Sequence, residues 1–547
     1  MRLYKDSLKI FFESKLFFLS TVLIYIGSAM FTLKYYKYPP DVTIITAQLN
    51  QGLKSAFYLF AAVMFLSYEY YLKFQRGGIE EASAVTVHGR KNHHLFCAFL
   101  TMTLWIAVLA AILTVCVILA YQYYKVRDPQ GEYILHIIKN MLINIFLIME
   151  LGSLIGLMLT GIKRRILSYA LILCIIYLVS PYPERIADAQ CVAGNISHSI
   201  YPIVELFNIM PLVNSGFPPI AVFGESILFY RLSLILFWMM FAVTMMLLTR
   251  KYEIKKILFS AIFTILFFCG YAAPASVVNM NGNPENTMAH DQYYYESSEV
   301  TKTKNEKAGY HITSYNMDLK IKRLLSAKVT MNVDESMGQY RMTLYHGYQV
   351  KKVSNQDGDS LEYKQNNDYI LIKNSENRNV TKICVEYKGY SAAYYSNSQG
   401  IYLPGDFAYY PRAGYIPLHN DEGMAMSSCF VQKDTKFQVK LQYSGRAYTN
   451  LTERNGVYTG RSDGFTIFAG FYKEKKFGKG NRIIYNYLED QYYLPGGEIE
   501  EVCKDNEKEL QKMGKSGVTI FVAPNVNQMR NRDVGEKQVF LRNSPWI

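Results

Sequence analysis

The chain has 547 residues, of which 50% are hydrophobic and 15% aromatic, and its formal net charge is +13. Its 8 cysteines exclude a disulfide scaffold and a zinc knuckle, because the second half holds only the widely spaced Cys384, Cys429 and Cys503. The basic balance does not indicate a nucleic-acid partner, since many of the charges flank apolar runs and are typical of topology signals and contacts with anionic lipid.

Long apolar runs are confined to the part of the chain before residue 275. A helix needs roughly 20 consecutive apolar residues to cross a bilayer, and the first half supplies such runs repeatedly. The sequence therefore predicts a polytopic α-helical membrane domain with six spans plus a seventh, linking span. The predicted spans are Leu16–Leu33, Ala56–Leu72, Leu95–Tyr121, Met141–Gly161, Ile166–Val179, Ile227–Leu248 and Ile257–Ala273.

Residues 1–15 precede the first span and have an amphipathic pattern. Leu3, Leu8 and Phe11 share one helical face, and Arg2 and Lys9 fall on the other. This pattern predicts a helix that lies along the membrane interface.

The loops between the spans alternate in charge. Basic clusters lie before span one and in the loops 73–94, 162–165 and 249–256, whereas the intervening loops contain fewer Lys and Arg residues. Positive loops stay on the cytoplasmic side, so we expect the N-terminus in the cytoplasm. The chain is then a multi-pass protein of the cell membrane. With seven spans, everything after Ala273 lies on the extracellular side.

The segment 182–226 is apolar in patches and is broken by four prolines, so it is not a clean span. Non-helical backbone at membrane depth needs protein or water around it. We expect short helices that dip into the outer face of the membrane.

From Gly309 onward the apolar residues alternate with a period of two, which predicts a mainly antiparallel β extracellular domain. The predicted strands include residues 312–321, 327–333, 342–350, 368–373, 382–389, 437–443, 464–471 and 482–487. A helix over 498–513 and a buried strand over 517–524 follow. The domains are then 1–256 (membrane domain), 257–280 (additional span), 281–308 (linker), 309–495 (β-domain) and 496–547 (helix–strand segment).

No motif for nucleotide or metal chemistry is found. Gly514-Lys515-Ser516 has the end of a phosphate-binding loop, but Glu509 stands where that loop requires its first glycine. The pattern H-E-x-x-H is absent. We therefore expect neither a catalytic residue nor a cofactor nor a metal in this chain.

Glu150 lies in the middle of the predicted fourth span. A carboxylate at that depth is costly, so it either has a functional or pairing role, or it is protonated or faces a water-filled cavity. Gly152 and Gly156 follow it and form a G-x-x-x-G pattern that permits close helix packing.

The loop 73–94 carries a further pattern. Arg76 and Gly77 are followed by the acidic pair Glu80 and Glu81, an apolar stretch, and the basic residues Arg90 and Lys91. The loop resembles the coupling region between the second and third spans of ABC-2-type transporter permeases. The amphipathic N-terminus, the six spans and the broken segment before the sixth are also similar to that family. The resemblance covers about residues 1–250. It implies that these loop residues contact a separate ATPase subunit, which binds the ATP.

The outer domain resembles the N-terminal β-domain of M1-family zinc aminopeptidases. The resemblance is carried by the order of the strands, by Tyr387-Lys388-Gly389, by the aromatic segment 400–415 and by the helix followed by residues 520–524. Residues 496–547 then correspond to the start of the M1 catalytic domain. A catalytic zinc needs three protein ligands. The family's activity is not carried over, because the chain lacks its H-E-x-x-H ligand set.

Three functions are consistent with the sequence. The first is a permease that moves cargo, peptide or lipid-like, with a partner ATPase and a second copy of itself or a related permease, using the β-domain to bind substrate or partner. The second is the membrane-anchored, non-catalytic part of a split or truncated M1-type aminopeptidase. The third is a surface receptor or immunity protein. Membrane lipids are expected partners of all three, and nucleic acid of none.

The predicted topology can be tested by labelling. Single cysteines at Gly78 and at Ser360, in a variant without native cysteines, lie on opposite sides of the membrane if the charge asymmetry of the loops sets the orientation. An impermeant maleimide added to intact cells should label the cysteine at 360 and leave that at 78 unlabelled until the cells are opened. Labelling of both in intact cells would refute the topology.

Overall fold

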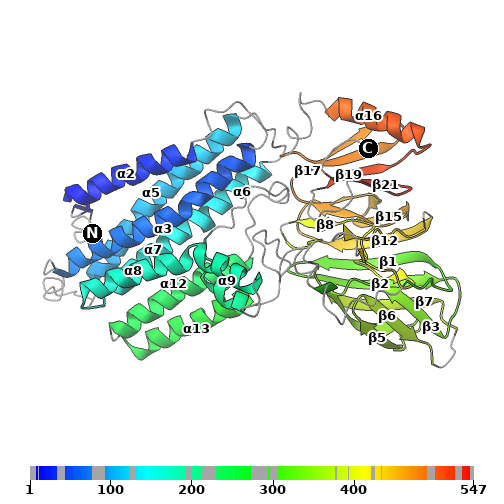
Figure 1. Ribbon diagram of the computed structural model, residues 1–547, viewed down its shortest axis with the longest axis horizontal. Helices are drawn as coiled ribbons and strands as arrows, with labels where there is room; N and C mark the ends of the chain where they lie inside the picture. The colour runs from blue at the N-terminus through cyan, green and yellow to red at the C-terminus, as the bar shows by residue number, and fades with distance from the viewer. Residues whose placement is uncertain are drawn as a thin grey trace. The chain divides into compact units, whose positions relative to one another are not determined.

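The computed structural model forms two compact units, one of residues 1–215 and 227–273 and the other of residues 216–226 and 274–547. The structure describes residues 8–9, 11–33, 44–76, 93–123, 128, 131–192, 200–210, 229–250, 252–272, 294–295, 305–375, 379–391, 394–398, 400–420, 425–432, 434–488, 499–523 and 532–542. The first unit is helical and the second is mainly β (Figure 1). Most of the predicted interfacial helix 1–15 and most of the linker 281–308 lie outside these residues.

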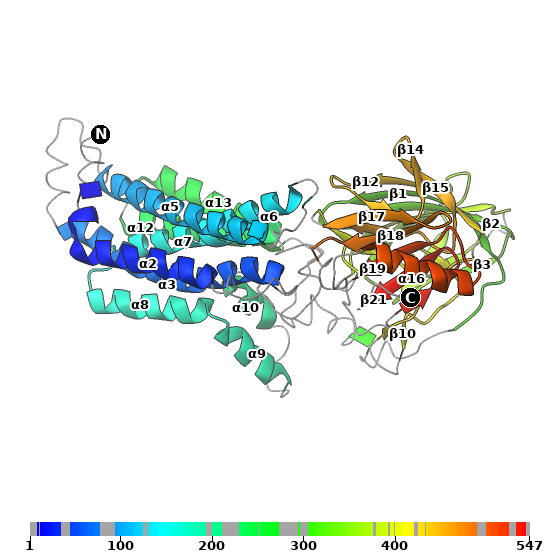
Figure 2. The ribbon, with the colours of Figure 1, turned by 90° about the horizontal axis from the view of Figure 1, so that it is seen from above.

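The helical unit is built from long apolar helices that run alongside one another (Figures 1 and 2). Their bounds are α2 Lys15–Thr32, α3 Ile44–Arg76, α5 His93–Tyr123, α6 Glu132–Met141, η2 Leu142–Phe146, α7 Leu147–Leu159, α8 Arg165–Val179, α12 Phe229–Thr249 and α13 Ile254–Ala272. Two short helices, α9 Tyr182–Val192 and α10 Tyr201–Phe207, lie in the proline-broken segment, as predicted.

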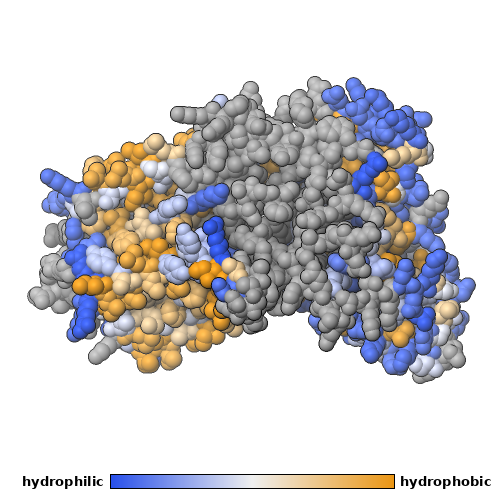
Figure 3. Space-filling view, viewed as in Figure 1, coloured by the Kyte–Doolittle hydropathy of each residue, from blue (hydrophilic) through white to orange (hydrophobic). Residues whose placement is uncertain are grey.

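Four helical stretches of the described residues are long and apolar enough to cross a membrane: Leu95–Tyr123, Glu132–Leu159, Arg231–Thr249 and Ile254–Ala272. They overlap predicted spans three, four, six and seven, although the fourth begins at Glu132, before the predicted start at Met141. Spans one and five fall on the shorter apolar helices Phe17–Met30 and Arg165–Val179, and span two lies within α3. The full count of seven spans remains a prediction. The face of this unit seen in Figure 3 is largely apolar.

Close packing of α7 against α3 explains the G-x-x-x-G pattern. A Cβ atom at Gly156 would lie 2.9 Å from the Met64 carbonyl oxygen, and one at Gly152 would lie 3.0 Å from that of Phe60. Real Cβ atoms rarely approach that closely, so only glycine lets the two backbones meet here. The motif therefore packs helices within this chain.

The β unit contains one large sheet and three smaller ones that share an aromatic core, together with a two-stranded hairpin. The strands of the large sheet, in spatial order, are β14 Thr452–Arg454, β15 Val457–Ser462, β12 Thr435–Gln442, β1 Ile312–Ile321, β2 Leu325–Val333, β7 Lys382–Gly389 and β4 Tyr348–Ser354. All neighbours in it are antiparallel except β1 and β12. The mainly antiparallel prediction is thus confirmed for this part.

Two smaller sheets and the hairpin complete the sandwich. One sheet contains β5 Glu362–Asn366, β6 Tyr369–Lys373, β3 Gln339–Thr343 and β9 Arg412–Ala413, the other contains β13 Tyr448–Thr449, β16 Ile467–Ala469 and β8 Ile401–Leu403, and the hairpin pairs β10 His419–Asn420 with β11 Ala425–Met426. The single strand predicted over 342–350 is wrong, because β3 and β4 belong to different sheets. The chain turns between them at Gly347, where a side chain would collide with the Tyr390 carbonyl oxygen.

The last sheet is of the α/β kind. Its order is β17 Tyr472–Phe477, β18 Asn481–Asn486, β19 Thr519–Ala523, β21 Gln538–Arg542 and β20 Arg532–Val534, with β18, β19 and β21 parallel. The predicted helix is present as α16 Ile499–Lys512 and connects β18 to β19. Its apolar side packs on one face of the sheet, and Phe521 and Phe540 on the other face join the aromatic core. The sheet thus contains strands from both sides of the boundary predicted at residue 495.

One buried carboxylate joins this sheet to the sandwich. Asp463 is 2% exposed. Its Oδ2 atom accepts hydrogen bonds from the backbone amides of Glu536 and Lys537, and its Oδ1 atom accepts one from Gln538 Nε2 at 3.1 Å. Hydrogen bonds to a charged acceptor contribute more than neutral ones, so Asp463 holds the β20–β21 turn in place.

We predict that Asp463→Asn loosens this attachment. The asparagine amide keeps one acceptor oxygen, but its NH₂ group would face N–H donors that the carboxylate now accepts from. The free energy of opening of β20 and β21 should therefore fall by about 2–3 kcal/mol. Hydrogen–deuterium exchange of a peptide covering 532–542 in the full chain measures it. Asp434→Asn, an exposed site, is the control. Equal exchange in both variants would contradict this role.

Candidate functional sites

The predicted ATPase-coupling residues lie at the end of α3 and beyond it. The backbone of Arg76 forms the last residue of α3, while Gly77, Glu80, Glu81, Arg90 and Lys91 fall outside the residues that the structure describes. The coupling role of this loop therefore stays a prediction.

Glu150 is in α7, four residues after the π-helical segment η2, and is 3% exposed. Neither carboxyl oxygen has a hydrogen-bond partner among the described residues. The Thr103 hydroxyl of α5 approaches the carboxyl group without completing a hydrogen bond, and one turn along α7 Ser153 is bonded to Tyr71 of α3 at 2.7 Å. A carboxyl group buried in an apolar helix bundle is costly, and π-helical insertions are frequent at functional sites.

A ladder of buried polar side chains crosses from α6 to α12. Arg231 is 3% exposed and donates from Nε to Asn144 Oδ1 and from Nη2 to the Ile209 carbonyl oxygen, both at 2.7 Å. Asn144 Nδ2 then donates to Asn140 Oδ1 at 2.9 Å, and Asn140 Nδ2 lies 2.8 Å from His136 Nε2. The spacing of four residues places His136, Asn140 and Asn144 on one helical face.

The ladder connects three parts of the helical unit. It fixes the start of α12 to η2 through Asn144 and to the turn after α10 through Ile209. Arg231 lies inside the predicted sixth span, and the same rule that drew attention to Glu150 applies to it. Sequence reasoning passed over Arg231 and the two asparagines, although an arginine within an apolar run was the signal that could have found them.

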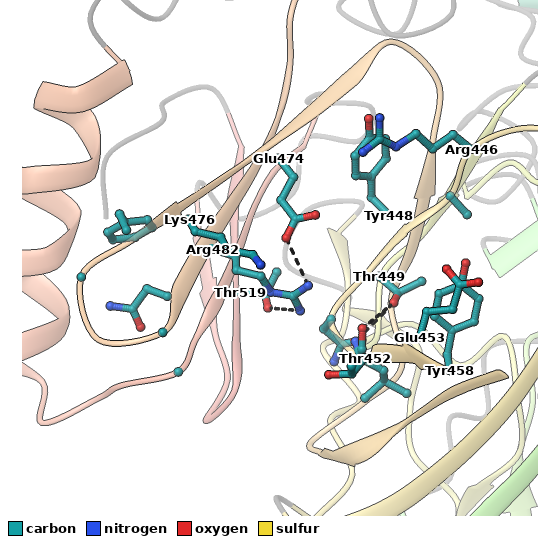
Figure 4. Close-up of a pocket in the computed structure, with 18 of the residues that line it drawn as sticks. Arg446, Tyr448, Thr449, Thr452, Glu453, Tyr458, Glu474, Lys476, Arg482 and Thr519 are labelled. Carbon is teal, nitrogen blue, oxygen red and sulfur yellow. Dashed lines mark hydrogen bonds and ion pairs between the residues drawn. The ribbon is translucent and has the colours of Figure 1, made fainter. Parts of the chain in front are cut away.

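A second candidate site is an open cleft of about 1100 Å³ in the β unit. One wall is a face of the last sheet, where Lys476 of β17, Arg482 of β18 and Thr519 of β19 are register neighbours. Figure 4 shows Arg482 at the centre, bonded to Glu474 Oε1 at 3.3 Å and to Thr519 Oγ1 at 3.0 Å.

The other wall of the cleft comes from the sandwich, through β13, β14 and β15. There the Arg446 guanidinium lies 4.8 Å from the centre of the Tyr448 ring, and Glu453 is exposed. Charges of both signs, hydroxyl groups and tyrosine rings suit a polar ligand that offers both donors and acceptors.

Burial raises the pKa of the Cys503 thiol to about 11 and that of Cys429 to about 12, so neither thiol is a thiolate nucleophile at neutral pH.

No protein-family model matches the chain, and no curated protein matches it. Solved structures do. An M1 zinc metallopeptidase from Deinococcus radiodurans is 15% identical with a TM-score of 0.28, and the match covers 43% of this chain and 61% of that one. Native leukotriene A4 hydrolase from Saccharomyces cerevisiae is 10% identical with a TM-score of 0.30, and the match covers 46% of this chain and 44% of that one.

These neighbours include an M1 peptidase, the class of protein whose N-terminal domain the outer domain resembles in sequence. The chain spans only 44% and 61% of their lengths. At such TM-scores the likeness assigns neither an activity nor a ligand to this chain.

We predict that Arg231 and Asn144 are energetically coupled. In a double-mutant cycle of Arg231→Met and Asn144→Leu, the coupling in the free energy of unfolding should be about 1–2 kcal/mol. A buried hydrogen bond to a charged group contributes more stability than the average hydrogen bond between membrane helices. Unfolding in mixed micelles with increasing dodecyl sulfate measures it.

The exposed ion pair of Arg165 and Glu69, 2.7 Å apart, is the matched control. Its cycle should give less than about 1 kcal/mol. A coupling of Arg231 with Asn144 no larger than that of the control pair would show that the ladder contributes little.

Proposed function

We propose that the chain is the membrane-spanning permease subunit of an ABC transporter. One observation carries the proposal: Arg231 and Glu150, each 3% exposed, are buried among apolar helices that are long enough to cross a membrane. Ionisable groups buried among such helices are rare and mark substrate or ion pathways. A pure membrane anchor has no need of them.

In this proposal the helical unit moves cargo, either peptide or lipid-like, when a separate ATPase subunit binds and hydrolyses ATP. Two permease halves surround one pathway, formed by two copies of this chain or by this chain and a related one. The chain lies in the cell membrane with its N-terminus in the cytoplasm, and the loop 73–94 meets the ATPase there.

The β unit then lies outside the cell and binds substrate or partner. The cleft around Arg482 and Glu474 supports this part, because it is wide, open and lined by groups that can pair with a peptide backbone and its charged side chains. The alternative of a non-catalytic M1-type anchor shares the β unit but gives no role to Arg231 and Glu150.

The proposal is tested at the loop 73–94. If the loop forms a helix along the membrane surface, the adjacent Glu80 and Glu81 let at least one side chain face the cytoplasm, where it can accept charge-assisted hydrogen bonds from Lys or Arg of the ATPase. Reversing both to Lys should weaken association by about 1–3 kcal/mol, a typical range for charged contacts. Recovery of the ATPase on the purified chain measures it.

The chain offers a matched control. Glu500 and Glu501 are a second adjacent pair of glutamates, which lie on α16 of the β unit and are exposed there. Reversing this pair makes the same change in charge and should leave recovery of the ATPase unchanged. Equal recovery with both reversed pairs would remove the loop from the mechanism. Failure to recover any ATPase with the unaltered chain would favour the anchor alternative.

A further inference from the structure

A partly open apolar cavity of about 190 Å³ lies in the helical unit between α7, α8, α12 and the turn after α10. Every described side chain that lines it is apolar, and the lining includes Ile155 of α7, Ile175 of α8 and Trp238 and Ala242 of α12. It is separate from the polar ladder and from Glu150, whose side chains do not line it.

The wall formed by the turn Phe207–Ile209 is held in a fixed shape. The Trp238 indole N–H donates to the Leu206 carbonyl oxygen at 2.8 Å, and Arg231 donates to that of Ile209 at 2.7 Å. The Ile209 amide in turn donates to the Phe207 carbonyl oxygen at 2.8 Å. These backbone groups are thus paired with protein, and they leave the Phe207 and Ile209 side chains to face the cavity.

Such a cavity selects an apolar occupant. Empty cavities of about 150 Å³ with a lining of this kind stay dry and accept small apolar ligands, because water needs polar partners. The lining also loses van der Waals contacts for as long as the space is empty. A ligand that fills it needs no hydrogen-bonding group.

The surrounding surface identifies which apolar ligand is available. Phe241 lines the cavity and is also 39% exposed, so the cavity reaches the outside of the unit at this side chain. On α8, Leu173 and Tyr177 are 60% and 50% exposed, while Ile175 and Leu178 line the cavity. The apolar outer surface is therefore continuous with the cavity wall, and the molecules that cover such a surface are lipids.

We propose that this cavity binds the end of an acyl chain of a membrane phospholipid. The chain enters beside Phe241 and lies against Trp238 and Ile155, and the pinned turn closes the far end. This site does not depend on a transport function, because it needs only the bilayer that the apolar helices require. Arg231 contributes to it by holding the Ile209 wall in place.

Trp238 provides the probe, since the chain has only 3 tryptophans, Trp105, Trp238 and Trp546. The variant Trp105→Phe, Trp546→Phe reports Trp238 fluorescence alone. It is reconstituted in phosphatidylcholine nanodiscs with an increasing fraction of the same lipid brominated near the end of its acyl chains. Bromine quenches tryptophan fluorescence only on near contact. Because brominated and unbrominated lipid compete equally for one site, a single bound chain should give quenching in proportion to the brominated fraction, whereas several lipids around the protein surface give quenching that rises steeply at low fraction and then levels off.

Two further substitutions separate the cavity from the outer surface. Ala242→Phe fills the cavity and should remove the quenching of Trp238 that comes from the bound chain, with Ala242→Leu as the milder variant should the larger ring prevent folding. Ile262→Phe on α13, where Ile262 is 61% exposed and outside the cavity, should leave it intact. Quenching that rises steeply and levels off at low brominated fraction, or that survives both changes at Ala242, would overturn the proposal.

Discussion

The helical unit depends on one constraint, which is that a buried cation among apolar helices must be paired within the protein. Arg231 meets it with an asparagine side chain and a backbone carbonyl oxygen, and the asparagine passes the hydrogen bonding on to Asn140. Because Arg231 and Asn144 are buried, these bonds fix the relative positions of η2, α12 and the turn after α10. The shape of the apolar cavity depends on that turn, because the Phe207 and Ile209 side chains line it.

The β unit also pairs a buried cation within the protein, here inside a larger core. Arg412 is fully buried, lies 3.6 Å from the centre of the Tyr410 ring, and donates to the carbonyl oxygens of Gly405 and Phe407. It thereby orders the aromatic segment 400–415, which has few backbone partners in sheets. Asp463 then fastens the last sheet to this core. The cleft around Arg482 lies between parts that are joined in this way, so the shared aromatic core and Asp463 together hold its walls in place.

The sequence predicted best what depends on local pattern. Period-two alternation located β1, β2 and β7, and helical periodicity located α16, because burial on one face of an element is visible in a short window. The strand predicted over 342–350 failed, since the need for glycine at Gly347 comes from Tyr390, which is more than forty positions away in the chain. The parallel pairing of β18, β19 and β21 also joins distant segments. In the membrane domain the long spans were visible, while the pairing of Arg231 with Asn144 links different helices and needed the structure.

The central claim is that Arg231 and Glu150 lie on a pathway that moves with the ATPase, and hydrogen–deuterium exchange tests it most directly. The chain is isolated with its ATPase in nanodiscs, and exchange is followed in peptides covering 132–159 and 229–249 with and without ATP and vanadate. The account predicts that trapping the ATPase with ATP and vanadate changes exchange in both peptides. The reason is that water reaches the polar ladder either in the trapped state or in the nucleotide-free state, but not in both. Identical exchange in the two conditions, with the ATPase bound and active, would contradict it and leave these groups a static part of the fold.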